Sequence, residues 1–364
     1  KKINSLKKLL KMKSCKYIED SLYIAPNEIR SCCQRFFYEG KMRGDAKLLE
    51  IKDGVTPTAD DLKKGRQKLF DEVQEDKNED CKGCPFLKKT NNKPLISHYI
   101  KHLSIEHHSV CNLRCNYCSE TYYGGKRSKY NVVEFIKYLN DSGSFENTRQ
   151  VVWGGGEPTL DKSFDKILEE INKNANPKLF HRVFTNSVRY SEAIEKFLKI
   201  GLIKITTSVD AGTPEVFKIV RGRPKFLNVF ENLNKYASID SKKITIKYIF
   251  TDENNSEKEL KGFVDNCLKY NLENCNFQLS MNYKKKKLDI DNLKKIVFLF
   301  SVLNQNGVKK IFVDDHISLR LISLSTEDIN QIISYINQQN LKNIILDPES
   351  VKDLIVYGAG EIAK

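Results

Sequence analysis

The chain has 364 residues, of which 30% are charged and 40% hydrophobic, and its formal net charge is +14. This length accommodates one large core or two domains. No apolar run is long enough to span a bilayer and no secretory signal is recognisable, so we expect a cytoplasmic protein with no membrane partner. The positive charge is mostly lysine spread along the chain, and its densest block, Lys284–Lys287, falls in a predicted surface loop. Charge therefore gives little support to a nucleic-acid partner.

In chain order, a cysteine-rich segment (1–100) precedes a long region (101–320) in which short β-branched runs alternate with helical patterns. The predicted strands are Leu103–His107, Gln150–Trp153, His181–Thr185, Lys204–Val209, Lys243–Phe250 and Asn276–Leu279. The predicted helices include Asn131–Leu139, Phe164–Asn172, Ser191–Lys199, Phe226–Ala237 and Glu257–Tyr270. Such repeats predict an α/β fold, a partial (β/α)6 TIM-like barrel with parallel strands and right-handed crossovers. In the C-terminal extension (321–364), the segment 353–364 resembles the start of a Rossmann-like unit.

Polar and glycine-rich segments follow successive predicted strands. They are the cysteine triplet 111/115/118, then 154–158, 185–187, 208–210 and 251–252. Barrels of this kind collect their chemistry at the carboxyl ends of the strands, so this order predicts one active face.

Cys111, Cys115 and Cys118 are spaced CxxxCxxC. Three close thiolates can each bind one iron of a [4Fe–4S] cube, which leaves the fourth iron open to a small chelating molecule. A zinc knuckle or a set of buried thiols are the alternatives, but zinc needs a fourth ligand and more often shows paired CxxC arms. With Tyr117 directly before the last cysteine, the spacing resembles the radical S-adenosylmethionine (radical SAM) enzymes. In that family the methionine amino and carboxylate groups of the cofactor bind the open iron.

The segment Gly155-Gly156-Glu157-Pro158 strengthens the resemblance. Glycines let the backbone pass close to a ligand, although a tight turn alone would also use them. In radical SAM enzymes this segment lines the methionine amino group, and the resemblance implies that Glu157 accepts a hydrogen bond from it. It also implies that Tyr117 lies near the adenine.

The stretch 207–212, followed by 220–224, is similar to the SxDG…RG pattern of the radical SAM branch with extra iron–sulfur clusters. The resemblance implies that Ser208 and Asp210 face hydroxyl or carboxylate groups of the cofactor. Arg221 would pair with the methionine carboxylate, which its planar guanidinium fits. Alternatively, Asp210 caps the next helix and Arg221 is a surface cation. Asn186 is a candidate ribose contact.

A second set of cysteines lies in the N-terminal segment: Cys15, Cys32, Cys33, Cys81 and Cys84. In a reducing compartment such groups are more typical of metal ligands than of disulfides. The stretch 23–32 resembles the hairpin of SPASM and twitch auxiliary-cluster domains, in which a cysteine ends the second strand. This implies that Cys32 joins Cys15, Cys81 and Cys84 around a second [4Fe–4S] cluster and that Cys33 packs. The rival is a structural zinc ribbon, and such domains usually follow the barrel rather than precede it. Cys267 and Cys275 are expected to be ordinary buried cysteines.

The resemblance implies an oxidoreductase that cleaves S-adenosylmethionine and abstracts hydrogen from a substrate C–H, with flavodoxin or ferredoxin as reductase. We expect a two-electron oxidation of a carbohydrate or another small metabolite. The alternatives are a peptide or protein maturase and a tRNA-modifying enzyme, and an electron-transfer protein would explain the clusters but not Gly155–Pro158. The sequence identifies no general base. Asp314, Asp315 and His316 follow a predicted strand; they could line the site, but we expect them to form a solvent-facing turn.

Overall fold

The computed structural model describes residues 12–91, 96–285, 287–321 and 324–338. The predicted Rossmann-like start at 353–364 lies outside these residues. The chain divides into two compact units: residues up to 111 with 120–183, and residues 112–119 with 184–364. The domain boundaries predicted at 100/101 and 320/321 stay predictions.

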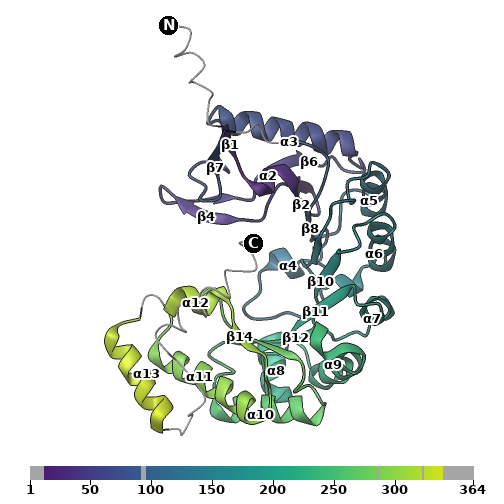
Figure 1. Ribbon diagram of the computed structural model, residues 1–364. Coiled ribbons are helices and arrows are strands. Elements are labelled where there is room, and N and C mark those ends of the chain that lie inside the picture. The colour runs from purple at the N-terminus through teal and green to yellow at the C-terminus, as the bar shows by residue number, and fades with distance from the viewer. Residues whose placement is uncertain (1–11, 92–95, 286, 322–323, 339–364) are drawn as a thin grey trace. The chain divides into compact units, whose positions relative to one another are not determined.

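The first unit carries three parallel strands of the predicted barrel. They are β8 (His102–Ile105), β9 (Gln150–Trp153) and β10 (Phe180–Phe184). The connection from β8 to β9 holds α4 (Glu120–Tyr123) and α5 (Val132–Asp141), and the connection from β9 to β10 holds η1 (Pro158–Leu160) and α6 (Phe164–Asn172). Helices α5 and α6 lie side by side (Figure 1). Trp153 packs against Phe164 in the core and donates to His181 Nδ1.

The cysteine-rich segment extends the same sheet. The hairpin expected at 23–32 is present as β2 (Ser21–Ile24) and β3 (Glu28–Arg30); β2 pairs in parallel with β8, and β3 pairs with β6 (Lys47–Glu50). The strand order of this unit is β10-β9-β8-β2-β3-β6. The remaining elements are β1 (Met12–Ser14), α2 (Lys16–Asp20), β4 (Arg35–Tyr38), β5 (Lys41–Gly44), α3 (Ala59–Gln74) and β7 (Lys88–Thr90). Strand β1 pairs with β7 and β4 with β5.

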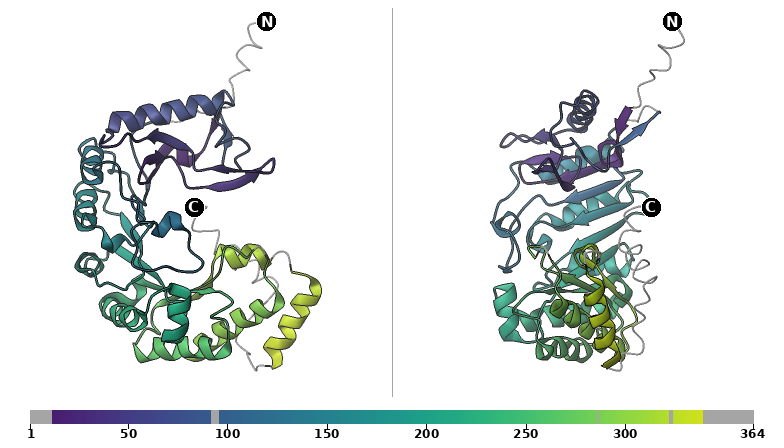
Figure 2. Two further views of the ribbon diagram at one scale, coloured as in Figure 1. Left: turned by 180° about the vertical axis from the view of Figure 1, so that it is seen from behind. Right: turned by 90° about the vertical axis from the view of Figure 1, so that its left-hand side faces the viewer.

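Helix α3 was not predicted from the sequence. A capping box between Thr58 and Asp61 begins it, and its buried face includes Leu62 and Leu69. It packs against β6, and Figure 2 shows it running across the N-terminal strands. Its buried Arg66 donates to the carbonyl oxygens of Ser21, Ser97 and Tyr99, at 2.9, 2.7 and 2.7 Å. Arg66 therefore ties the helix to the chain that enters β2 and β8.

The second unit continues the alternation of strand and helix. Its parallel strands, in the order β14-β13-β12-β11, are β11 (Ile203–Ser208), β12 (Ile244–Phe250), β13 (Asn276–Met281) and β14 (Ile311–Val313). Its helices are α7 (Glu192–Lys199), α8 (Pro214–Arg221), α9 (Phe226–Asp240), η2 (Ser241–Lys243), α10 (Glu257–Lys269), α11 (Ile290–Gln305), α12 (Asp315–Leu321) and α13 (Thr326–Gln338). Alternate residues of β12, namely Ile246, Tyr248 and Phe250, are buried, and Tyr248 packs on Phe263 of α10.

These elements confirm the predicted α/β fold of the partial TIM-like class, with strands and helices within a few residues of their predicted positions. Cys267 and Cys275 are buried, as expected. In the described part of the chain, no helix has the length and apolarity to cross a membrane.

Candidate active site

The three cysteines of the CxxxCxxC motif lie on the connection between β8 and α4, and all are half-buried. The Cys118 amide donates to the Cys115 carbonyl at 3.0 Å, which forms a turn. Within the second unit, the loop is bound to the end of α8, because the amide of Arg114 donates to the carbonyl of Arg221 at 3.1 Å. Gly222 is left-handed there, with a φ of 74°, and a Cβ on it would lie only 2.4 Å from the Arg114 oxygen. The backbone therefore fixes the part of the loop that carries Cys115 and Cys118.

Tyr117, Asp210 and Arg221 form one hydrogen-bonded group in the second unit. Asp210 Oδ2 accepts from the Tyr117 hydroxyl at 2.6 Å and pairs with Arg221 Nη1 at 3.0 Å, while Arg221 also donates to the Tyr117 oxygen. Asp210 is 0% exposed and Arg221 5%, so Arg221 is no surface cation. Asp210 does not cap α8 either, since Thr213 accepts from the Val216 amide in that position.

Asp210 occupies a backbone conformation that a residue other than glycine rarely adopts, with a φ of 61°. Its Oδ1 accepts from the Ile249 amide of β12 at 2.7 Å, and its carbonyl accepts from Asn254. Burial raises the pKa of Tyr117 well above its usual range, so the phenol stays protonated and donates to Asp210. The group connects the residue before the last cysteine of the loop to the carboxyl ends of β11 and β12.

Asn186 and Ser208 also lie at the carboxyl ends of their strands. Asn186 is buried, and its amide donates to Asn112 Oδ1 at 2.6 Å, directly after Cys111 in the sequence. Ser208 ends β11 and is half-buried. Both therefore stand where the sequence analysis expected cofactor contacts, but no described contact assigns them that role.

The glycine-rich segment after β9 packs on the backbone that leads into the cysteine loop, within the first unit. The Gly156 amide donates to the His108 carbonyl at 3.0 Å, and the Glu157 amide donates to the Val110 carbonyl at 2.8 Å. Gly155 is left-handed, with a φ of 84°, and a Cβ on Gly156 would lie 2.2 Å from the Val110 oxygen. Both positions therefore require glycine. The buried Glu157 carboxylate accepts from the amide and hydroxyl of Thr159 and begins η1.

The four cysteines predicted as a second ligand set meet in the first unit. Cys15, Cys32, Cys81 and Cys84 line one cavity, together with Tyr17, Phe36 and Phe86. Burial raises the pKa of Cys15 to about 11, and the neighbouring Cys32 and Cys84 add to the rise. The expectation that Cys33 packs was wrong, because its side chain is exposed. In extended chain, neighbouring side chains point to opposite sides, and after β3 the half-buried side belongs to Cys32.

Comparison with known proteins identifies the region that contains the cysteine triplet and the glycine-rich segment. Residues 105–264 match the family model of the radical SAM superfamily. Residues 105–264 belong to the radical SAM superfamily. The match covers the predicted strands and helices from β8 to α10, and it contains the cysteine triplet, Gly155–Glu157, Asp210 and Arg221.

Curated relatives match less than half of this chain. GTP 3',8-cyclase of Pasteurella multocida is 30% identical over 170 residues, which are 45% of this chain and 50% of the relative. The enzyme of the same name from Haemophilus ducreyi is 28% identical over 144 residues, 38% of this chain and 42% of that one. The chain thus spans about half the length of the curated relatives it matches. Among solved structures, Streptococcus suis SuiB aligns over 77% of this chain and 61% of its own, with 15% identity and a TM-score of 0.48.

Membership of the radical SAM superfamily implies a [4Fe–4S] cluster and S-adenosylmethionine, and the residues present fit both. The loop offers three thiols on one short connection, one fewer than a cube has irons. The two glycines leave no room for side chains beside the backbone before Cys111. A backbone fixed at this position can present its amides and carbonyls to a bound methionine group.

The structure also reveals a carboxylate that the sequence analysis missed. Glu106 follows β8 directly, and its Oε2 accepts from the buried hydroxyl of Tyr23 at 2.6 Å. In the described part of the chain its second oxygen, Oε1, receives no hydrogen bond, yet it is not sealed from solvent. Burial raises the pKa of Glu106. A Cβ on Gly154 would lie 3.1 Å from Oε1, so this oxygen faces the start of the glycine-rich segment. The sequence feature that could have pointed to Glu106 is its position at the end of the first barrel strand.

Asp314 was expected in a solvent-facing turn, and this was wrong. Its carboxylate is largely buried and pairs with Lys247 Nζ at 2.9 Å, while Gln278 donates to it at 3.3 Å. The three residues come from β12, β13 and the end of β14, on the half-buried face of these strands. His316 is exposed.

His107, His108 and Asp161 form a compact group beside a cavity of about 200 Å³ in the first unit. One nitrogen of each histidine and both oxygens of Asp161 have partners within the protein. Asp161 Oδ2 lies 2.7 Å from His107 Nε2, its Oδ1 accepts from the Ser163 amide, and His108 Nδ1 accepts from the Val110 amide. These hydrogen bonds hold the turn after β8.

Proposed function

We propose that this chain is a radical SAM oxidoreductase that carries out a two-electron oxidation of a hydroxyl-bearing small metabolite, such as a carbohydrate. The observation that carries the proposal is the combination of the three-cysteine loop with a separate cavity lined by four cysteines. The first set suits an open, cofactor-binding cluster, and the second suits a fully ligated one.

Cys111, Cys115 and Cys118 would hold the first cluster. When bound to it and reduced by one electron, S-adenosylmethionine supplies a 5′-deoxyadenosyl radical, which removes a hydrogen atom from a substrate C–H bond. Gly155 and Gly156 would line the methionine amino group, and Glu157 would accept from it. Tyr117, Asn186, Ser208, Asp210 and Arg221 are proposed as the remaining cofactor contacts. Because Arg221 already pairs with Asp210, we propose that this pair fixes Tyr117 near the adenine while the guanidinium reaches the methionine carboxylate.

Cys15, Cys32, Cys81 and Cys84 would hold an auxiliary [4Fe–4S] cluster that serves as a one-electron acceptor. Tetrahedral zinc, with Zn–S distances of about 2.3 Å, places its sulfurs about 3.8 Å apart. A zinc ion would therefore have to draw all four sulfurs onto one atom. An iron–sulfur cube suits a wider arrangement, since each thiolate binds a different iron at its own corner.

Glu106 is proposed as the proton acceptor. Loss of a hydrogen atom from the carbinol carbon leaves a substrate radical, and its conversion to a carbonyl requires loss of the hydroxyl proton and of one electron. The proton passes to Glu106 Oε1, which is held in place by the Tyr23 hydroxyl on the other oxygen. Burial raises the pKa of Glu106, which makes its carboxylate a stronger base than an exposed one. The auxiliary cluster that Cys15, Cys32, Cys81 and Cys84 would hold would supply the one-electron acceptor.

The partners of this reaction are a small-molecule substrate and a reductase such as flavodoxin or ferredoxin. The relatives named GTP 3',8-cyclase act, by their name, on a nucleotide, which is itself a hydroxyl-bearing small metabolite. Their likeness is confined to about half their length, so the substrate class rests on the carboxylate at Glu106 rather than on their name.

The test is anaerobic incubation of the reconstituted protein with dithionite and S-adenosylmethionine, followed by measurement of 5′-deoxyadenosine. The wild type should form it, and a Cys111/Cys115/Cys118→Ala variant should not. With deuterated nucleotides and sugar derivatives as candidate substrates, deuterium in 5′-deoxyadenosine identifies the substrate. Glu106→Gln should retain this deuterium transfer but form at least tenfold less carbonyl product. Equal 5′-deoxyadenosine formation by wild type and triple variant would sink the proposal, and full carbonyl yield from Glu106→Gln would remove Glu106 from it.

A further inference from the structure

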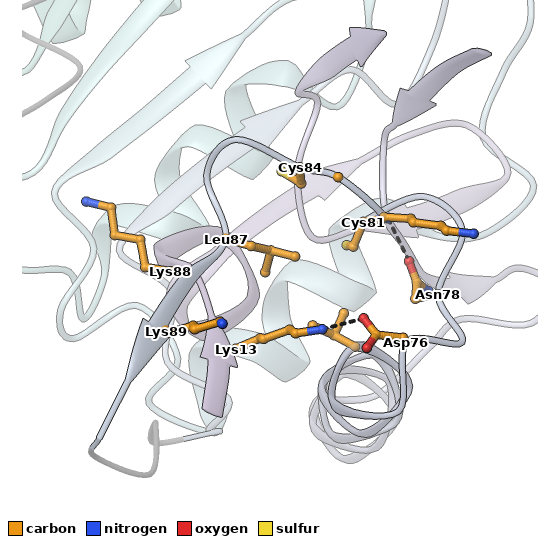
Figure 3. Close-up of a pocket in the computed structure, with 11 residues that line it drawn as sticks. Lys13, Asp76, Asn78, Cys81, Cys84, Leu87, Lys88 and Lys89 are labelled. Atoms are coloured by element: carbon orange, nitrogen blue, oxygen red, sulfur yellow. Dashed lines mark hydrogen bonds and ion pairs between the residues drawn. The ribbon is translucent and has the colours of Figure 1, made fainter. Parts of the chain in front are cut away.

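A lysine-rich pocket of about 210 Å³ adjoins the four-cysteine cavity, with which it shares lining residues. Figure 3 shows the residues that line this pocket. Lys13, Lys82, Lys88 and Lys89 line it, and Asp76 is the only acidic residue among those that line it. Cys81 and Cys84 belong to the lining of both this pocket and the four-cysteine cavity. These two proposed cluster ligands therefore lie between the cavity and the surface pocket, together with Leu87, which also lines both.

The lysines of this pocket are unequally neutralised. Lys13 pairs with Asp76, and Lys82 lies 3.6 Å from Glu79, which Arg43 also engages. Lys88 and Lys89 have no carboxylate within 4.0 Å in the parts of the chain that the structure describes, and both are exposed. Both lysines lie on β7, shortly after the CxxC turn formed by residues 81–84. Their positive charge is therefore exposed to solvent at the pocket that Cys81 and Cys84 also line.

We propose that this pocket, with Lys82, Lys88 and Lys89 around it, is the docking surface for a small acidic electron-transfer protein that exchanges electrons with the auxiliary cluster. The inference rests on the proposed auxiliary cluster and adds its partner and its place of entry. Lysines steer an acidic partner by long-range attraction, and weak electron-transfer contacts need only a small interface. A redox group seated over the pocket would be separated from the cluster by Cys81, Cys84 and Leu87, the residues that line both the pocket and the cavity.

The test uses flavodoxin as probe and the full chain with its first cluster removed by Cys111/Cys115/Cys118→Ala, so that only the auxiliary cluster reacts. Lys88→Glu/Lys89→Glu is compared with a control of equal charge change, Lys242→Glu/Lys258→Glu, whose lysines are exposed in the second unit. The Kd for flavodoxin is measured by calorimetry, and the rate of cluster reduction by flavodoxin hydroquinone is measured by stopped flow at low and high salt.

The pocket double variant should bind flavodoxin at least about tenfold more weakly at low ionic strength and accept electrons correspondingly more slowly. The difference should vanish near about 0.5 M salt, where screening removes long-range steering. Reduction by dithionite, a small reagent that needs no docking, should be unchanged, and the control should stay within about twofold of its parent. Equal effects of both double variants would overturn the docking surface while leaving the cluster in place. A parent protein without iron would overturn the auxiliary cluster and the docking surface together.

Discussion

Replacement of Gly156 by alanine tests whether the glycine-rich segment positions the cysteine loop. A Cβ at this position would lie 2.2 Å from the Val110 oxygen, and real Cβ contacts essentially never fall below 3.0 Å. The Val110 carbonyl must therefore move by at least 0.8 Å. This carbonyl accepts the Glu157 amide at 2.8 Å and immediately precedes Cys111.

The expected cost follows from these contacts. Loss of the hydrogen bond costs about 1 kcal/mol. Overpacking against backbone that cannot rotate away costs a further 1–3 kcal/mol or so. We therefore expect a total loss of about 2–4 kcal/mol in the stability of the first unit, together with lower iron occupancy at the triplet because Cys111 moves with Val110.

The assay combines urea unfolding, followed by the fluorescence of Trp153, with iron analysis and the Kd for S-adenosylmethionine. Trp153 is the only tryptophan of the chain and lies in the core of this unit. Gly54→Ala is the control: Gly54 has a φ of 76°, but a Cβ on it would have no atom within 4 Å, so it should lose about 1 kcal/mol of stability and no iron. If Gly156→Ala keeps full iron and unfolds like Gly54→Ala, the proposed positioning of Cys111 is refuted.

Three further predictions concern the first unit. Arg66→Met should lower the free energy of unfolding by about 3 kcal/mol in urea titrations, because it leaves buried carbonyls without a donor; a loss below 1 kcal/mol would contradict this role. Burial lowers the pKa of His181 to about 3, whereas its pKa in the unfolded chain is about 6.5. Below pH 6.5 the unfolded chain therefore binds a proton that the folded chain does not bind, and the stability of the fold falls as the pH falls. Between pH 8 and pH 6 the free energy of unfolding, followed by Trp153 fluorescence, should fall by roughly 0.8 kcal/mol more in the wild type than in His181→Asn. Equal losses in both proteins would disprove this role of His181. Cys32→Ala should lose about four irons per chain and Cys33→Ala none, and the opposite pattern would reverse the ligand assignment.

Much of the barrel could be predicted because its strands are short β-branched runs followed by polar or glycine-rich residues. Gln150–Trp153 and Phe164–Asn172 have the predicted bounds in the structure. The four N-terminal cysteines were predicted from spacing and resemblance, and they do line a common cavity.

The remaining features depend on contacts between distant residues. Tyr117 and Asp210 are 93 residues apart, and Tyr23 and Glu106 are 83 apart, so no local pattern reveals either hydrogen bond. Asp314 looked like a turn residue until its pairing with Lys247 of β12 placed it against the sheet. In each case a polar side chain is buried because a partner satisfies it, and the sequence does not name the partner.

The most direct test of the account is the iron and sulfide content per chain after anaerobic reconstitution, for the wild type and for Cys111/Cys115/Cys118→Ala. Two independent cubes predict about eight irons in the wild type and about four in the variant. Removal of Cys15, Cys32, Cys81 and Cys84 should leave the other four. A wild type with about four irons, and a triple variant with none, would contradict the auxiliary cluster and with it the oxidation proposed for this protein.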